Sequence, residues 1–575
     1  MAEAVYVGRE DEEAISYLLG CCFPQFVPKL MENQINNSCV IFKDILSRVF
    51  RIHEFITVFI EDGYVDRIYR DCYYSHYSGK HIEYSRDCRR VFLFSNDCRD
   101  AISDYNENEL NQNFIGSVVI KPLAVGAIGR TLICPKYLFD DSEKKDTYIR
   151  TAQYSVHLRG MKLTVNAFPY SMQDSETLTC AETTLLNIFD YYSKKYPDYK
   201  FVMPSDIFFA AKANGYERAL PSTGMTYTLM SKIITSFGFY PRLYMKDDLQ
   251  SALTGDEELL RILSYYVESA IPVAVGIHQE KDRYNHSIVC IGHGKNNVNK
   301  MMHKLQRITV NDSEPDDDSM IPAPRRLFIA DCANSMEEFI MMDDNYSPYH
   351  KYTVTREKQP NDMLSEDIIT LNGSQILCLA VPLCKRMYLE AQSARNIVIE
   401  ALQEDKFSFD KQYKMCFGKE IGTESNPIIM RFFMASSRTF KRQRILCLSD
   451  DDISKMLYSV VSLPQFVWVC ELYDLTHYQD TKQPIGEIVL DATATAPPIK
   501  STPIDSILLV NYPGKNYIHF RSKVPNEFVE SILEDMIVDY DNPNEDNSLF
   551  ILDEVKLESF KMFDGNLKCT DKLHN

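Results

Sequence analysis

Three residues whose side chains can together perform nucleophilic catalysis occur in order along the chain. Cys180 opens a helix-like segment, His286 precedes the apolar run 288–291, and Asp331 ends the apolar run 327–330. A thiol, an imidazole and a carboxylate are the nucleophile, the base and the group that orients the base in thiol hydrolases. The order predicts a Cys180–His286–Asp331 triad, which the fold must bring together.

The residues around Cys180 favour an ionised sulfur. Thr179 and Glu182 match the S/T-x-x-E capping box, which places Cys180 at the first helical position. Unpaired backbone N–H groups and the helix dipole favour a thiolate there. The same amides can supply one oxyanion donor, and Gln173 is a candidate for the second.

The base and its orienting acid are predicted to come from neighbouring strands. In an antiparallel pair, the start of one strand lies beside the end of its neighbour, so His286 and Asp331 can meet if strands 287–292 and 326–330 pair. His278 is a weaker candidate base. His293 is set aside because the sequence offers it no nearby acid.

The pattern of apolar residues predicts a helical half followed by a sheet half in the central region. Leu185, Ile188, Phe189 and Tyr192 define one face of a helix that continues from Cys180. Further helices are predicted at 205–213, 224–237 and 256–270, and strands at 272–277, 287–292, 326–330 and 375–382. Outside this region, helices are predicted at 12–19, 37–51 and 385–404, and strands at 55–60, 114–122, 129–135, 428–434, 466–472, 486–490 and 506–511.

A chain of 575 residues is too long for one hydrophobic core. We predict an α+β protein with an N-terminal α/β domain at 1–160, a central hydrolase domain at 161–384 and a C-terminal α/β domain at 385–575. The polar stretch 294–325 reads as an excursion between two strands, and its acidic part, 312–318, favours disorder.

Composition narrows the classes of partner and site. A net charge of −19 disfavours binding to nucleic acid or to anionic membranes. The 16 cysteines include no CxxC pair, so we expect no metal and no cofactor, with most thiols reduced and buried. The acidic N-terminus lacks the apolar core of a signal peptide, and no apolar run reaches membrane-spanning length, which predicts a cytoplasmic protein.

The arrangement of these motifs resembles the papain-like cysteine peptidase superfamily. Gln173 before Cys180, then Pro-Val-Ala-Val-Gly at 272–276, the run 285–294 around His286 and finally Asp331 are similar to the bacterial peptidases that trim double-glycine leaders. The resemblance covers residues 165–384. It implies an acyl-enzyme on Cys180, His286 as general base and acid, Asp331 as its orienter and Gln173 as oxyanion donor.

The expected activity is cleavage of a peptide or isopeptide bond in a dedicated protein or peptide partner, with the flanking domains recognising that partner. Three alternatives stay open at this point. The central domain can be an inactive scaffold, the triad can serve an acyltransferase or a transglutaminase, or the terminal domains can carry the function of an interaction hub. The sequence does not define the oligomeric state.

Overall fold

The computed structural model describes most of the chain. The residues that it describes are 3–26, 36–215, 224–246, 255–279, 284–310, 325–357, 368–447, 455, 458–459, 461–494, 506–520, 537–541, 548–555 and 561–573. The acidic stretch 312–318 lies outside these ranges, so its predicted disorder is not addressed. The protein mixes helices with several largely antiparallel sheets, in agreement with the predicted α+β class.

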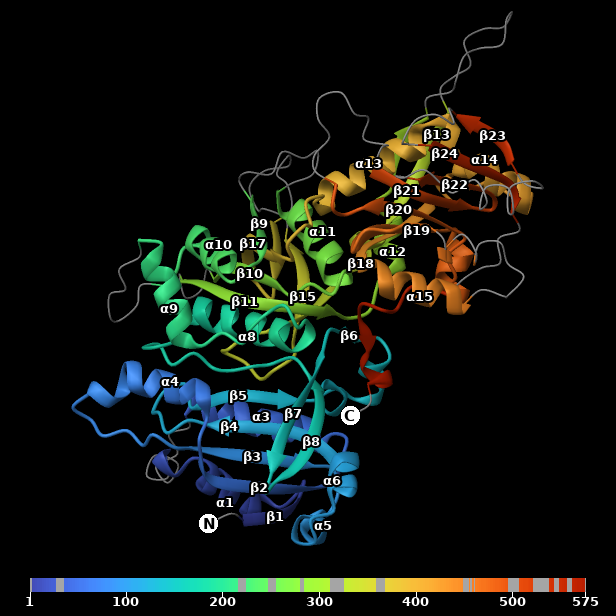
Figure 1. Ribbon diagram of the computed structural model, residues 1–575. Helices are drawn as coiled ribbons and strands as arrows, with labels where there is room; N and C mark the ends of the chain where they lie inside the picture. The colour runs from blue at the N-terminus through green and yellow to red at the C-terminus, as the bar shows by residue number, and fades with distance from the viewer. Residues whose placement is uncertain are drawn as a thin grey trace, which may run out of the picture.

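The N-terminal sheet contains five antiparallel strands in sequential order, β1-β2-β3-β4-β5. Its strands are β1 (Glu3–Gly8), β2 (Phe55–Tyr64), β3 (Cys88–Phe94), β4 (Phe114–Ile120) and β5 (Ile128–Ile133). The accompanying helices are α1 (Glu12–Cys22), α3 (Asn37–Phe50), α4 (Arg67–Ser75), α5 (Arg99–Ser103), α6 (Glu107–Asn113) and α7 (Asp141–Lys144). A hairpin of β7 (Ala152–Leu158) and β8 (Met161–Ala167) follows, and it crosses this sheet in Figure 1.

The central region begins with helices and continues into a closed sheet. Its helices are α8 (Cys180–Lys195), α9 (Pro204–Ala213), α10 (Tyr227–Ser236) and α11 (Gly255–Glu268), at the predicted places. Six strands then pair in a ring, β10-β11-β14-β15-β16-β17 and back to β10, every pair being antiparallel. They are β10 (Val273–Gln279), β11 (Tyr284–His293), β14 (Glu338–Met342), β15 (His350–Glu357), β16 (Ile368–Leu371) and β17 (Ser374–Leu383).

Three short strands extend this closed sheet at its margins. They are β6 (Tyr148–Ile149), β9 (Tyr240–Met245) and β25 (Lys568–Cys569). β9 pairs with β17, and β6 lies between β11 and β25. The end of the chain therefore returns to the central sheet (Figure 1).

The C-terminal sheet runs in the order β12-β13-β18-β19-β20-β21-β22-β24-β23. Its strands are β12 (Gln306–Thr309), β13 (Arg326–Asp331), β18 (Ile428–Ser436), β19 (Phe466–Tyr473), β20 (Gly486–Asp491), β21 (Ile507–Tyr512), β22 (Gly514–Phe520), β23 (Ile537–Asp541) and β24 (Ser548–Val555). The neighbouring helices are α12 (Val298–Met302), α13 (Ala391–Gln403), α14 (Phe409–Phe417) and α15 (Ser437–Cys447).

The pairing of β13 contradicts the predicted neighbour of His286. Strand β13 pairs with β12 and, in parallel, with β18 of the C-terminal sheet, whereas β11 pairs with β14. Figure 1 shows β13 among the orange and red strands. The predicted domain bounds place β12 and β13 in the central domain, but both strands lie in the sheet that the C-terminal region forms.

Helix α8 lies between the N-terminal sheet and the closed sheet (Figure 1). Every residue from Ala181 to Tyr192 is buried, including five polar ones that the helix must satisfy. The buried apolar residues form two large cores around these elements. One core joins the N-terminal sheet to α8, and the other joins the interior of the closed sheet to the C-terminal sheet. Among the described residues, no helix is long and apolar enough to cross a membrane.

Candidate functional site

The helix start at Cys180 forms as the sequence predicts. Thr179 is the N-cap of α8, and its backbone N–H and hydroxyl both donate to the Glu182 carboxylate at 2.8 Å. The Cys180 thiol is half-buried, while most other cysteines are fully buried. The nucleophile candidate therefore stands at the positive end of a helix with partial access to solvent.

A rigid turn leads from Gln173 into this helix. The Asp174 carboxylate accepts backbone N–H groups of Glu176, Thr177 and Leu178 at 2.9, 2.7 and 2.8 Å. Burial alone would raise the pKa of Asp174, but the Lys121 charge and these donors hold it below its ordinary value. The ionised carboxylate stabilises this turn because it accepts three backbone N–H groups.

The N-terminal sheet carries the segment before this turn. Tyr170 and Thr131 exchange backbone hydrogen bonds as an antiparallel bridge, and the Met172 N–H donates to the Ile128 carbonyl at 3.0 Å. Gly126 packs against the backbone of Gln173. A Cβ atom on residue 126 would come within 1.9 Å of the Gln173 carbonyl oxygen. The N-terminal sheet thus acts as a scaffold for the approach to Cys180.

His286 lies at the start of β11, buried and facing α8. The Thr184 hydroxyl donates to the Ser287 carbonyl at 3.0 Å, which fixes the helix against this strand. The Cys180 side chain lies close enough to the His286 imidazole to raise its pKa. Two of the predicted residues, Cys180 and His286, are therefore brought together.

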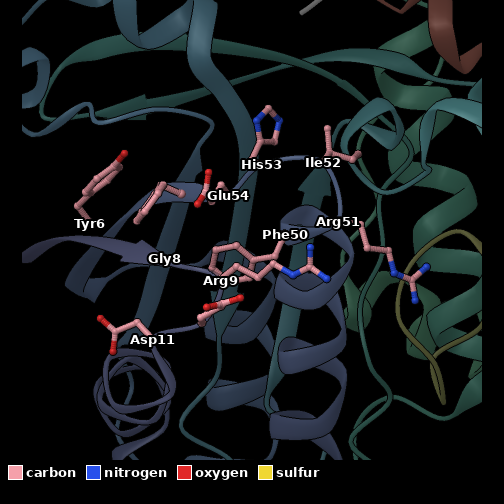
Figure 2. A pocket seen from close by; sticks show the side chains of 11 residues that line it. Tyr6, Gly8, Arg9, Asp11, Phe50, Arg51, Ile52, His53 and Glu54 are labelled. Atoms are coloured by element: carbon pink, nitrogen blue, oxygen red, sulfur yellow. The ribbon is translucent and has the colours of Figure 1, made fainter.

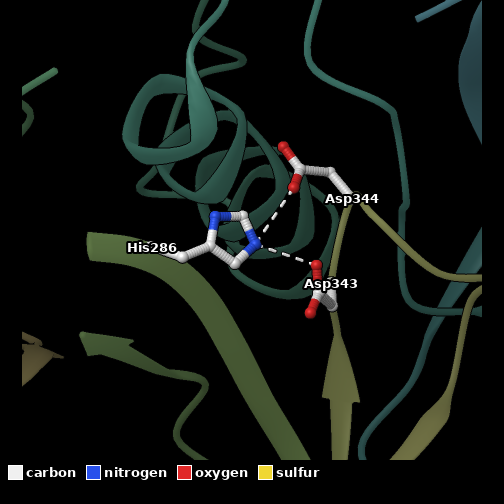
Figure 3. A group of neighbouring side chains, drawn as sticks. All are labelled: His286, Asp343 and Asp344. Carbon is white, nitrogen blue, oxygen red and sulfur yellow. Dashed lines mark hydrogen bonds and ion pairs between the residues drawn. The ribbon is translucent and has the colours of Figure 1, made fainter. Parts of the chain in front are cut away.

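The acid that orients His286 is Asp343, at the end of β14. His286 Nε2 lies 2.9 Å from Asp343 Oδ1 (Figure 3). Asp343 Oδ1 also accepts the Asn345 backbone N–H at 2.9 Å, and the Tyr352 hydroxyl donates to Oδ2. Burial opposes ionisation, but the bond and charge of His286 and the Tyr352 hydroxyl hold the pKa of Asp343 below its ordinary value.

Asp331 does not contact His286, which corrects the prediction for the third residue of the triad. Its carboxylate accepts the Arg395 Nε–H at 2.9 Å and the Tyr265 hydroxyl, and it caps the short turn at Cys332 through the Ala333 N–H. Asp331 is a buried structural acid. It follows β13 into the C-terminal sheet and so leaves the neighbourhood of β11.

A local signal for Asp343 is present in the sequence. The segment 339–342 is a short apolar run that is followed by an acid, and it resembles the run that ends at Asp331. Both segments become strands. Only the pairing of β14 with β11 distinguishes the catalytic candidate from the structural acid.

A second acid, Asp344, also faces the imidazole. Its Oδ1 lies 3.3 Å from His286 Nε2, and its side chain is 4% exposed. Neither carboxylate oxygen accepts a hydrogen bond of normal geometry, although the backbone N–H of Gln173 faces the group. No pattern in the sequence indicates that two consecutive acids share one nitrogen.

The surroundings of His286 favour its cationic form. Burial lowers its pKa, but hydrogen bonds with Asp343 and Cys180 and the charges of Asp343 and Asp344 raise it to about 11. Because Nε2 faces the carboxylates, Nδ1 is the ring nitrogen left for the sulfur (Figure 3). A helix start beside a cationic imidazole is the kind of environment in which reactive cysteines are found.

Gln173 lies at the start of the turn, half-buried, with its backbone beside Asp344. Its role as oxyanion donor stays a prediction.

Tyr227, the first residue of α10, is a neighbour of Cys180 that sequence reasoning missed. Burial raises the pKa of its hydroxyl, as do the nearby sulfurs of Cys378 and Cys180. A Cβ atom on residue 276 would lie 2.3 Å from this hydroxyl. The glycine in β10 therefore leaves the space in which the Tyr227 ring packs against the strand.

The two other histidines that the sequence analysis considered, His278 and His293, have partners away from Cys180. His278 Nδ1 lies 2.8 Å from Asn285 Oδ1 at an exposed position. His293 stacks on Tyr148 and lies 3.2 Å from Glu268, so it does have an acidic partner, contrary to the sequence expectation. Neither replaces His286 as the partner of Cys180.

His286, Asp343 and Asp344 are also the group, among the described residues, whose nitrogen and oxygen atoms lie within 4.8 Å of one another, as the ligands of a cation do. Hydrogen bonds already use both oxygens of Asp343, and Cys180 lies beside the same imidazole. This bonding describes an acid–base relay more fully than a set of metal ligands.

A hollow of about 710 Å³ lies on the N-terminal sheet and contains none of these residues (Figure 2). The ends of β1 and α3 and the starts of α1 and β2 line it. Its rim is polar, with Arg9, Glu10, Arg51 and Glu54 exposed. This hollow lies apart from the candidate nucleophile and base, which are on α8 and β11.

Neither the protein-family models nor the curated protein sequences give a match to this chain.

Proposed function

We propose that the protein is a papain-like cysteine hydrolase that cleaves a peptide or isopeptide bond of a protein or peptide partner. The observation that carries this proposal is the placement of Cys180 beside an imidazole whose Nε2 lies 2.9 Å from a buried, ionised Asp343. A helix start that faces the first strands of a closed antiparallel sheet is the arrangement that such enzymes use.

The reaction runs through an acyl-enzyme. The Cys180 thiolate attacks the carbonyl carbon, and the resulting oxyanion accepts the backbone N–H of Cys180 and, in this proposal, the Gln173 amide. The His286 Nδ1–H gives its proton to the leaving amine as the C–N bond breaks. Neutral His286 then takes a proton from water, whose oxygen attacks the thioester and releases a carboxylic acid and the thiolate.

The flanking regions have two roles in this proposal. The N-terminal sheet holds the turn before Cys180, and both flanking regions offer surfaces for a dedicated partner in the cytoplasm. If an amine of a second molecule replaces water at the thioester, the same residues perform acyl transfer. If the thiol is not activated, the domain is a binding scaffold.

The test measures the reactivity of the thiol first. We expect iodoacetamide near neutral pH to label Cys180 at least about tenfold faster than the exposed Cys416 and Cys447, because a thiolate is the reacting form. His286→Ala should abolish the difference. Equal labelling of the three cysteines in the folded wild type contradicts an activated thiol and favours the scaffold.

The second step identifies the reaction. A proteome-derived peptide library incubated with the wild type or Cys180→Ala is compared by mass spectrometry. New peptide termini that require Cys180 support hydrolysis. Mass additions without new termini assign acyl transfer instead.

A further inference from the structure

Two buried carboxylates face one imidazole nitrogen. His286 Nε2 lies 2.9 Å from Asp343 and 3.3 Å from Asp344, and Figure 3 shows both carboxylates on the same side of the ring. A protonated Nε2 offers one hydrogen to both. Asp343 also accepts hydrogen bonds from the Tyr352 hydroxyl and the Asn345 N–H, so its negative charge is better stabilised than that of Asp344. Asp344 has no hydrogen bond of normal geometry.

The groups that face Asp344 come from three segments. β11 supplies His286, the turn after β14 supplies Asp343, and the segment before α8 supplies the Gln173 N–H and the Tyr170 ring. The Tyr170 hydroxyl is committed to the Tyr346 carbonyl at 2.7 Å. A second buried anion without strong hydrogen-bond donors is energetically unfavourable. Protonation of Asp344 removes this negative charge and lowers the free energy of the folded site.

Electrostatics agree with the geometry. Burial raises the pKa of Asp344, the His286 charge lowers it and the Asp343 charge raises it, with a result of about 7. The Asp344 carboxyl therefore gains or loses its proton near neutral pH, while Asp343 beside it stays ionised. Two consecutive acids with different environments take different protonation states.

We propose that Asp344 is a positioning residue that holds a proton in the active enzyme and, once it loses that proton, fixes His286 as a cation. This inference rests on the proposed thiol hydrolase. With neutral Asp344, one negative charge faces the ring, and the ring can give up and regain its Nδ1 proton. An ionised Asp344 adds a second negative charge and opposes the loss of that proton in each catalytic cycle.

The matched variants are Asp344→Asn, which imitates the protonated carboxyl, and Asp344→Ser, a second neutral side chain in case the first does not fold. With a peptide substrate, kcat of the wild type should fall about tenfold from pH 6.5 to 8.5, following ionisation of one group. In the neutral variants it should change less than about twofold over the same range. A merely structural role would lower kcat without removing its pH dependence.

A substrate-free measurement separates this inference from the proposed function. The rate of Cys180 alkylation by iodoacetamide has an upper inflection when His286 deprotonates, and the neutral variants should move it about one pH unit lower. An activated Cys180 with the same inflection in wild type and both variants overturns the inference alone. A Cys180 without activation overturns the proposed function as well.

A metal ion in place of the proton would also overturn the inference. Calorimetric titration of Cys180→Ala with Zn²⁺ tests this, with Asp344→Asn in the same background as control. Tight binding that requires Asp344 assigns the carboxylate to a metal. We expect no binding that depends on Asp344.

Discussion

At the residue scale, the identity of the orienting acid decides how the imidazole is held. Asp343 bonds to His286, to a backbone N–H and to Tyr352, so it has one position and one charge. Asp331 has equally strong partners in Arg395 and Tyr265, but they serve the C-terminal sheet. Two acids with the same local sequence pattern thus perform different work.

We expect Asp343→Asn to lower kcat for peptide cleavage at least about 100-fold, because an amide no longer fixes the tautomer of His286 or stabilises its charge. Asp331→Asn is the matched control, since it is the same substitution at a buried acid. It should lower the melting temperature while kcat at 20 °C changes less than about threefold. A larger loss of kcat in the Asp331 variant would restore the acid predicted from sequence.

At the element scale, the N-terminal region forms part of the site rather than an appended domain. Besides the bridge at Tyr170, helix α3 holds the turn that follows the acids. The Arg48 guanidinium donates to the Pro348 carbonyl at 2.7 Å and to the Ser347 hydroxyl at 3.2 Å. The turn before Cys180 and the turn after Asp344 are therefore both fixed from the same side.

Gly126→Ala tests this dependence. The added methyl group would overlap the Gln173 carbonyl oxygen, and the residue has a φ of +61°, where alanine is strained. We expect displacement of the turn, a loss of stability of about 1–3 kcal/mol and at least about tenfold slower alkylation of Cys180.

Gly63→Ala separates strain from displacement. Gly63 has a φ of +71° in the same conformational region, and a methyl group there would have no other atom within 4 Å. It should show strain on chemical denaturation but normal alkylation of Cys180. Equal alkylation rates in the two variants would show that the N-terminal sheet does not position the nucleophile.

At the scale of the whole molecule, a buried ionic network joins the central region to the C-terminal sheet. Arg431 on β18 lies 2.7 Å from Glu268 of α11 and 2.9 Å from Glu471 of β19. Burial opposes the charge of Glu268, but Arg431 and His293 hold its pKa at about 2. Glu268, Glu471 and Arg431 remain charged at neutral pH, so their ion pairs stabilise one relative placement of the two sheets.

We expect Arg431→Met to lower the free energy of unfolding by about 3–5 kcal/mol, because it removes the guanidinium that two buried carboxylates share. Glu268 then keeps His293 beside it, and Glu471 keeps Arg444. Urea denaturation at pH 7 measures this change. Lys414→Met removes an exposed ion pair with Glu420, whose side chains are 65% and 68% exposed, and should change stability by less than about 1 kcal/mol. A similar effect of both substitutions would contradict the role of the network.

Local signals in the sequence determined the parts of this protein that depend on near neighbours. The capping box at Thr179 and Glu182, the apolar face of α8 and the strand-like runs all formed where predicted, because caps and periodicity act within a few residues. The juxtaposition of Cys180 and His286 also followed from order and context, and so did the mixed α+β class.

Tertiary structure alone decided which acid meets the imidazole. Residues 326–331 and 338–343 look alike as sequence, but β13 pairs with β18 while β14 pairs with β11. Strand pairing is a long-range choice, made by the cores that two sheets share, and an apolar run does not encode its partner. The same long-range packing placed Asp344 beside His286 and attached the N-terminal sheet to the turn before Cys180.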